Sequence, residues 1–178
     1  MAIVPDDKDW TWVLGRPCPE CGLGAGSVEP ERVPAMVRDS VPTWRRVLAR
    51  SDARERPDES TWSPLEYACH VRDVCHRFDE RLVLMLEQDD PLWDNWDQDA
   101  TAVAERYGDQ DPATVADELA AEAEAIAARF EAVRGDQWDR PGRRSNGSVF
   151  TVASFARYFV HDLVHHVYDV TGERHGSS

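Results

Sequence analysis

Three histidines and two aspartates lie on one apolar stretch near the end of the 178-residue chain, residues 155–170. An imidazole or a carboxylate buried without a partner costs on the order of a few kcal/mol, so these side chains need partners. Side chains at i and i+4 of a helix share a face, which predicts two candidate metal-binding pairs: His161 with His165, and Asp162 with His166. Spacing alone does not choose between the pairs. The first pair offers two imidazoles, which suit zinc, nickel or ferrous iron, and the second offers a mixed site of one carboxylate and one imidazole.

A third ligand is expected from an earlier helix. The segment from Ser63 to Glu66 combines a serine cap, a proline at the first helical position and a capping-box glutamate, which predicts a helix over residues 64–87. His70 lies at the edge of the apolar stripe of this helix, where a side chain can face a cleft. Taken alone, His70 fits a partly exposed surface histidine better, and His76 is expected on the surface.

Cys18 and Cys21 form a Cys-Pro-Glu-Cys-Gly turn, which is half of a zinc knuckle. A structural zinc needs four ligands, and no second pair has the right spacing, because Cys69 and Cys75 lie six residues apart on a predicted helix and point to different sides. The turn is therefore interpreted as a packed loop with buried, free thiols. A self-contained zinc site and a redox pair remain alternatives.

Amphipathic periodicity and capping residues predict four helices, at residues 31–50, 64–87, 112–134 and 152–171. Pro42 predicts a kink or a break in the first. The aromatic-rich segment 89–108 is expected to pack over a core edge or the mouth of a pocket. With no convincing strand, the pattern indicates an all-α fold: a four-helix up-and-down bundle at residues 29–178 with one long crossover loop, and an irregular N-terminal arm at residues 1–28 packed on it.

Composition narrows the class of partner. A hydrophobic content of 42% suits one globular domain, and the formal charge of −14 argues against nucleic acid or an anionic membrane. Charged residues at positions 6–9 interrupt any apolar leader, and no run approaches the roughly 20 apolar residues of a membrane span. We expect a cytoplasmic protein that takes a small-molecule substrate, and we leave open whether it forms a homodimer.

Trp62-Ser63-Pro64-Leu65-Glu66 leading to His70, and then His161-Asp162-Leu163-Val164-His165, together resemble the DinB/YfiT superfamily. Its members are similar four-helix bundles with one histidine from the second helix and a His-x-x-x-His pair from the fourth. Asp9-Trp10-Thr11-Trp12 and the Cys18–Gly22 turn look like those of an actinobacterial branch.

The resemblance implies metal ligands at His70, His161 and His165, with His166 and Asp169 as neighbours that support them. Three imidazoles leave a coordination position open, as in a catalytic metal site. The expected cofactor is a divalent metal ion, zinc first, with nickel or iron as alternatives. No catalytic or cofactor-binding residue beyond these ligands is assigned.

What is known of the superfamily implies that the metal activates a low-molecular-weight thiol, as in the similar mycothiol-dependent maleylpyruvate isomerase and bacillithiol transferases. The isomerase pattern, however, has a carboxylate where His161 stands. The predicted function is therefore a thiol S-transferase, with mycothiol or a similar thiol as co-substrate. The alternatives are a metal-dependent hydrolase and a non-catalytic, metal-stabilised small-molecule or stress-response binding protein.

A further alternative needs no metal. The histidines would then be core residues that hydrogen-bond to Asp73, Asp162, Asp169 or the tyrosines.

Overall fold

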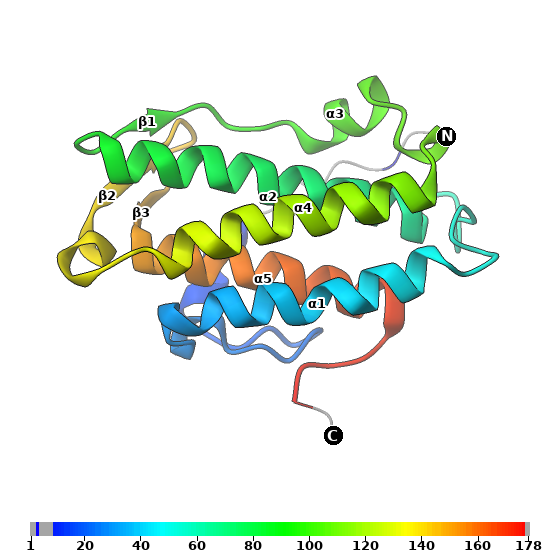
Figure 1. Cartoon of the computed structure of the whole chain (residues 1–178), viewed down its shortest axis with the longest axis horizontal. Helices are drawn as coiled ribbons and strands as arrows, with labels where there is room; N and C mark the ends of the chain where they lie inside the picture. Colours follow the sequence, from blue (N-terminus) through cyan, green and yellow to red (C-terminus); the bar gives the residue numbers. More distant parts are fainter. Residues whose placement is uncertain (1–2, 4–8, 177–178) are drawn as a thin grey trace.

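The computed structural model describes residue 3 and residues 9–176. The charged residues expected to interrupt a leader, at positions 6–8, and the first part of the predicted arm lie outside the described residues. Within the described part, the predicted all-α four-helix bundle with one long crossover is confirmed (Figure 1). The four long helices are α1 (Val33–Leu48), α2 (Pro64–Glu87), α4 (Pro112–Glu131) and α5 (Val152–Thr171).

The helices are arranged so that α1 and α2 each pack against both α4 and α5. Each of these two pairs, α1 with α2 and α4 with α5, therefore lies on a diagonal of the bundle. The connection at residues 88–111 carries the chain back to the end where α2 began, so α2 and α4 run in the same direction (Figure 1). This crossover contains the short helix α3 (Gln98–Ala104) and a 3₁₀ turn (Tyr107–Asp109).

Side-chain caps fix where the site-bearing helices begin. The hydroxyl of Ser63 accepts from the backbone N–H of Glu66, and the Glu66 carboxylate accepts from the N–H of Ser63, so the predicted capping box of α2 is present. Thr151 accepts from the N–H of Ser154 at the start of α5. α1 continues through Pro42 without the break that the proline allowed, because buried side chains on both sides of it, including Trp44, hold the helix to the core.

A small sheet is present that the sequence analysis did not expect. Its strands β1 (Leu92–Trp93), β2 (Pro141–Arg144) and β3 (Val149–Thr151) pair in that order, β1 parallel and β3 antiparallel to β2. Strands of two to four residues are too short for an alternating pattern to stand out. Gly142 is needed at its position, since a Cβ there would lie 2.6 Å from the ring of Trp93.

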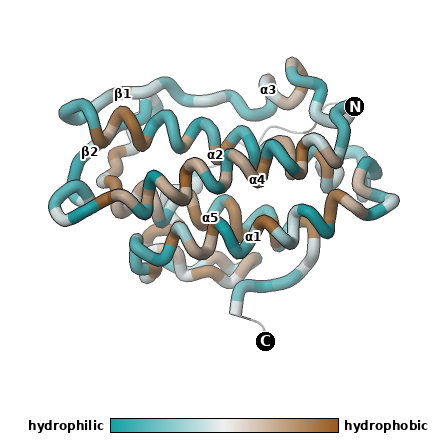
Figure 2. The backbone as a smooth tube through the Cα atoms, viewed as in Figure 1, coloured by the Kyte–Doolittle hydropathy of each residue, from teal (hydrophilic) through white to brown (hydrophobic). Residues whose placement is uncertain are grey.

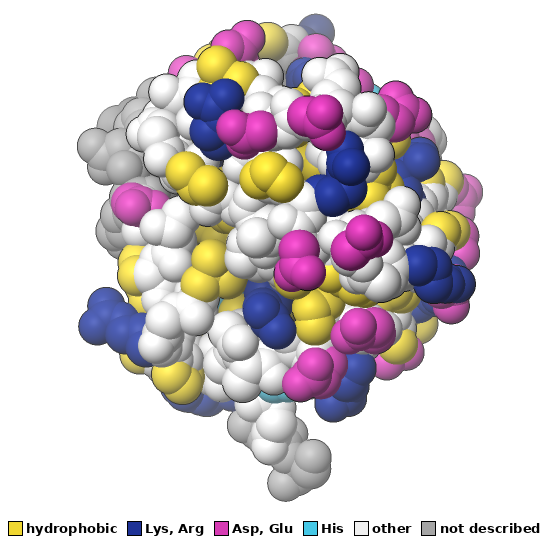
Figure 3. Space-filling model, turned by 90° about the vertical axis from the view of Figure 1, so that its left-hand side faces the viewer, with side chains coloured by type: hydrophobic (Ala, Val, Ile, Leu, Met, Phe, Trp, Pro, Cys, Tyr) yellow, Lys and Arg dark blue, Asp and Glu magenta, His cyan; other side chains and the backbone are white. Residues whose placement is uncertain are grey.

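The core lies between the four long helices, along which hydrophobic and hydrophilic bands alternate (Figure 2). Aromatic side chains fill one end of it, where Phe78 stacks on Phe155 with ring centroids 4.7 Å apart. On the face seen in Figure 3, acidic and basic side chains are interspersed rather than gathered by sign. None of the described helices is long and apolar enough to span a membrane.

The described part of the N-terminal arm packs against α5 through two 3₁₀ turns, Trp10–Leu14 and Ala25–Ser27. Arg157 of α5 donates from Nε to the carbonyl of Val28 at 2.8 Å. The segment after α5 also contacts the arm, since the backbone N–H of His175 donates to the carbonyl of Cys21 at 2.7 Å. The arm is thus held between α5 and the C-terminal segment.

Candidate metal centre

The structure divides the three predicted ligands between two clusters. His70 of α2 lies with Asp162 and His166 of α5, and their ligand atoms all lie within 4.8 Å of one another. We call these three residues the His–Asp–His cluster. Nε2 of His166 is 3.4 Å from Oδ1 of Asp162, and Nε2 of His70 is 3.9 Å from Oδ2 of the same carboxylate.

His161 and His165 gather instead with Cys18 and Cys21 of the arm, again within 4.8 Å. We call these four residues the cysteine–histidine cluster. Among the described residues, His161 and His165 therefore lie with the arm cysteines and not with His70, the partner that the resemblance implied for them. The physical reason is helical geometry: adjacent residues point about 100° apart, so the pair at 161 and 165 faces the arm while Asp162 and His166, one residue later, face α2.

The Cys18–Gly22 turn is packed, as interpreted from the sequence, and it has neighbours that the sequence did not indicate. The cysteines are free and buried, as expected, but imidazoles from α5 complete the group. The chain has no second cysteine pair with the right spacing, but the i, i+4 histidine pair of α5 supplies two further candidate ligands. The i, i+4 spacing of His161 and His165, which predicted a metal site shared with His70, was also the sequence signal for the cysteine–histidine cluster.

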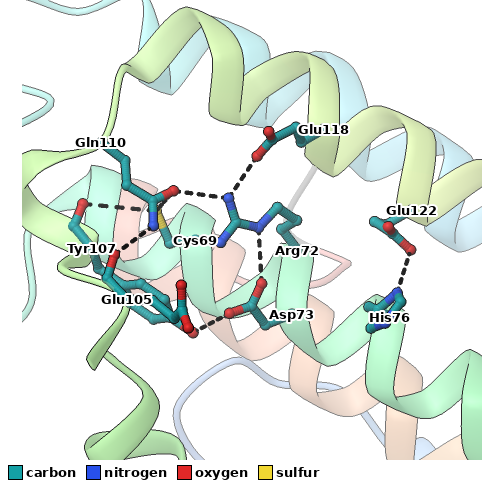
Figure 4. Close-up of polar contacts among 9 residues, drawn as sticks. All are labelled: Cys69, Arg72, Asp73, His76, Glu105, Tyr107, Gln110, Glu118 and Glu122. Atoms are coloured by element: carbon teal, nitrogen blue, oxygen red, sulfur yellow. Dashed lines mark hydrogen bonds and ion pairs between the residues drawn. The ribbon is translucent and has the colours of Figure 1, made fainter. Parts of the chain in front are cut away.

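His70 is 1% exposed, not on the surface as its position alone suggested. Its ring lies between those of Trp62 and Trp96, at centroid distances of 5.3 and 5.6 Å. Burial lowers the pKa of His70 to about 4, so the ring is neutral and offers a lone pair to a metal ion. His76, six residues later, is exposed and pairs with Glu122 at 3.2 Å (Figure 4).

A carboxylate from the next turn of α5 holds the ring of His166. Nδ1 of His166 donates to Oδ2 of Asp169 at 2.8 Å, which directs Nε2 toward Asp162. Burial disfavours the charged imidazole, but the charges of Asp162 and Asp169 and their hydrogen bonds outweigh it and raise the pKa of His166 to about 10. Metal binding therefore displaces a proton from this ring.

The pKa of the Asp162 carboxyl moves in the opposite direction. Burial opposes its charged form, but the neighbouring His166 cation and the hydrogen bond from it hold the pKa well below its usual range. Asp162 is thus ionised at any ordinary pH. It supplies the negative charge that a cation in this cluster would need.

Hydrogen bonds do not satisfy two of the buried imidazoles within the described part of the chain. Nδ1 of His70 and Nε2 of His161 have no partner there. Asp73 was one expected hydrogen-bond partner of the histidines in the absence of metal. Its carboxylate instead accepts from Nε of Arg72 at 2.8 Å and from the hydroxyl of Tyr107 (Figure 4). Unpaired buried polar atoms are rare in native proteins and call for an explanation such as a bound ion.

A cavity of about 650 Å³ borders both clusters, between the arm, the crossover and α5. Asp162 and His166 face it, and Trp10 of the arm and Trp96 of the crossover form walls. The aromatic crossover was expected to cover a core edge or the mouth of a pocket. It does both, because Trp93 is buried in the core while Trp96 lines the cavity. The volume suits a small organic ligand. Six carboxylates line the cavity, whereas Arg144 is the single arginine or lysine among its described lining residues.

Comparison with known proteins agrees with this architecture. The DinB superfamily profile matches residues 24–170, and the chain belongs to that superfamily. No curated protein sequence matches the chain. A similar solved structure is YfiT from Bacillus subtilis, described as a probable metal-dependent hydrolase with an unusual four-helix bundle topology. It superimposes with a TM-score of 0.65 at 18% identity, over 96% of this chain and 91% of YfiT, and shows the shared fold.

Proposed function

We propose that this protein is a metal-dependent enzyme in which the His–Asp–His cluster holds a divalent metal ion that activates a small nucleophile. The observation that carries the proposal is the convergence of two imidazoles and one carboxylate at the wall of a cavity. Three protein donors leave at least one coordination position for substrate, which is the arrangement of a catalytic site.

The donor atoms fit such an ion. A tetrahedral metal ion about 2.0–2.2 Å from each ligand atom places the ligand atoms about 3.3–3.6 Å from one another. The two oxygens of Asp162 lie 3.4 Å from His166 Nε2 and 3.9 Å from His70 Nε2, and one ligand atom from each of the three residues lies within 4.8 Å of the others, so the donors must draw together around an ion. Two imidazoles with one carboxylate suit zinc, and they also form the set typical of ferrous iron; nickel is a further alternative.

When bound, a divalent metal ion lowers the pKa of a water molecule or a thiol and so supplies a nucleophile at neutral pH. The protein contributes orientation and shielding. Asp169 fixes the ring of His166 by accepting from Nδ1, and the indoles of Trp62 and Trp96 fix the ring of His70 and exclude water from it.

A low-molecular-weight thiol is the nucleophile that we favour. The isomerase pattern has a carboxylate where His161 stands, and in this structure the carboxylate paired with a histidine on α5 is Asp162, one residue later, beside His166. The carboxylates around the cavity favour a thiol without net negative charge, such as mycothiol. Arg144 is available for one anionic group on the electrophile.

Hydrolysis is the second candidate. It is supported by the likeness to YfiT, itself described as a probable metal-dependent hydrolase. In that case a water molecule takes the place of the thiol in the same cluster. A purely structural role for this cluster is less well supported, because a closed site would present a fourth protein ligand rather than a cavity.

The test begins with protein purified without an affinity tag, loaded in turn with Zn²⁺, Ni²⁺ or Fe²⁺. Each form is assayed for conjugation of mycothiol to a bimane electrophile and, without thiol, for hydrolysis of activated esters and amides. Metal-dependent conjugation supports the S-transferase, and metal-dependent hydrolysis alone supports the second candidate. Neither activity with any metal would contradict an enzymatic role.

The matched control is His76→Ala, which removes an exposed histidine from the same helix as His70. We expect His70→Ala to abolish the metal-dependent rate and His76→Ala to leave it unchanged. Equal rates in the two variants would contradict the ligand assignment.

A further inference from the structure

We propose that the cysteine–histidine cluster is a second metal site, a closed structural zinc site that fastens the N-terminal arm to α5. Its donors come from two segments far apart in the sequence, Cys18 and Cys21 from the arm and His161 and His165 from the helix. This site goes beyond the proposed function and does not depend on it, because it uses none of the residues of the His–Asp–His cluster.

The atomic separations match a tetrahedral zinc ion. With Zn–S near 2.3 Å and Zn–N near 2.0–2.1 Å, tetrahedral geometry places sulfur and nitrogen about 3.5–3.6 Å apart. Sγ of Cys18 lies 3.6 Å from Nδ1 of His165. That distance fits a hydrogen bond to sulfur in the absence of metal, and it equally fits two ligands of one zinc ion.

Burial removes solvent as the partner of these atoms. Cys18 and Cys21 are at most 1% exposed and His161 is 3% exposed. Nε2 of His161 has no hydrogen-bond partner among the described residues, although burial there lowers the pKa of the ring to about 4 and keeps it neutral. The ring of His161 is therefore neutral and buried, and its Nε2 lacks a hydrogen-bond partner among the described residues, as expected of a ligand side chain without its metal ion.

The backbone of the arm has the form of a zinc-binding turn. The N–H of Cys18 donates to the carbonyl of Leu23, and the N–H of Gly22 donates to the carbonyl of Cys18, both at 2.9 Å. Gly22 has φ +82°, a conformation that side chains disfavour, so a glycine directly after Cys21 permits this turn. Burial raises the pKa of the Cys21 thiol to about 11, and a hydrogen bond from the Leu23 amide to the sulfur partly opposes this rise.

Charge favours zinc in this buried position. Two thiolates and two neutral imidazoles around Zn²⁺ sum to zero, which minimises the cost of burying the ion. Binding displaces the two thiol protons to solvent. Four protein ligands leave no position for substrate, so the site is structural.

The site also builds part of the cavity. The ring of Trp10 packs on His161 and His165 at centroid distances of 5.8 and 5.2 Å, and Trp10 lines the cavity. Zinc between the arm and α5 would therefore hold this wall in place. The described part of the arm, residue 3 and residues 9–28, has no long helix to do so.

The experiment isolates this site in the variant His70→Ala/His166→Ala, in which the His–Asp–His cluster is removed. After expression and tag-free purification in zinc-containing medium, we expect one zinc per chain by elemental analysis. X-ray absorption at the zinc edge should report two sulfur and two nitrogen ligands. A first shell without sulfur, or no zinc in this variant, would overturn the proposal.

When Cys18→Ser and Cys21→Ser are added to the His70→Ala/His166→Ala variant, we expect the protein to lose its zinc. When Cys69→Ala and Cys75→Ala are added instead, we expect the protein to keep it. Substitution of Co²⁺ for zinc gives a second readout, because thiolate-to-cobalt charge-transfer bands should appear in the parent and vanish in the serine variant. Retained bands in the serine variant, or a Cys18–Cys21 disulfide in protein isolated under reducing conditions, would refute the site. The absorption measurement on the parent does not depend on how well the serine variant folds.

Discussion

The two clusters use neighbouring residues of the same helix and nevertheless differ in almost every chemical respect. One takes His161 and His165 together with two arm thiols, and its donor set is complete. The other takes Asp162 and His166 together with a single histidine of α2, and its set is incomplete and borders the cavity. The comparison shows that partner elements, not the helix itself, decide how many candidate ligands gather around each i, i+4 pair of α5.

One carboxylate links the two clusters. Oδ2 of Asp169 accepts from Nδ1 of His166 at 2.8 Å, while Oδ1 lies 3.8 Å from Nε2 of His165. Asp169 thus supports the open cluster through a hydrogen bond and the closed one only through a longer contact. This asymmetry provides a way to separate them by mutation.

Loss of a ligand from the open cluster should give the largest effect. We expect His166→Ala to lower the metal-dependent rate by more than the roughly 100-fold typical of losing an outer partner, because a ligand itself is removed. Its zinc content should fall by one ion per chain and not by two. Elemental analysis and steady-state kinetics on the same preparation check both numbers, and complete loss of metal would mean that the clusters do not bind independently.

Asp169→Asn should have the next largest effect. An asparagine keeps the shape but loses the charge that orients His166, so we expect metal affinity at the open cluster to fall about 10- to 100-fold. Zinc at the closed cluster should be little affected, given the 3.8 Å contact there. Competition with a chromophoric chelator measures the two affinities separately; equal losses would show that Asp169 serves both clusters alike.

Removal of the two cysteines from the cysteine–histidine cluster should raise the rate of proteolysis in the arm by a larger factor than it lowers the metal-dependent catalytic rate. In Cys18→Ser/Cys21→Ser we expect proteolytic cleavage within residues 9–28 to become about tenfold faster, since local opening controls such cleavage. The metal-dependent rate should fall by less than that factor, through the displaced Trp10 wall. Limited proteolysis followed by mass spectrometry tests this, with Cys69→Ala as control. An arm that is cleaved no faster would indicate that packing alone holds it.

The smallest effect is expected at the start of α2. Ser63→Ala removes the side-chain cap of this helix and should lower the free energy of unfolding by about 1 kcal/mol. Both clusters should keep their metal, because the cap lies nearly two turns before His70. Chemical denaturation measures the change, with the exposed Ser60→Ala as the comparison. A selective loss of metal from the open cluster would show that the cap also positions His70.

Much of this fold could be predicted because its signals are local. The capping box at Ser63, the proline after Asp111 and the glycine that ends α5 all act within one helical turn, so helix bounds follow from the sequence. The sheet could not be predicted. β1 and β2 meet only when the crossover lies beside the turn before α5, a contact between segments about 50 residues apart.

The candidate site divides in the same way. The sequence by itself determined that residues 161 and 165 form one pair and 162 and 166 another, because 3.6 residues per turn fixes which side chains share a face. It left His70 open, because a position at the edge of an apolar stripe fits a partly exposed residue as well as a ligand. Only the tertiary structure decided which pair meets His70 and which meets Cys18 and Cys21, because that choice depends on the rotation of α5 about its own axis. Packing of its apolar residues against α1, α2 and the arm sets that rotation, and no local pattern encodes it.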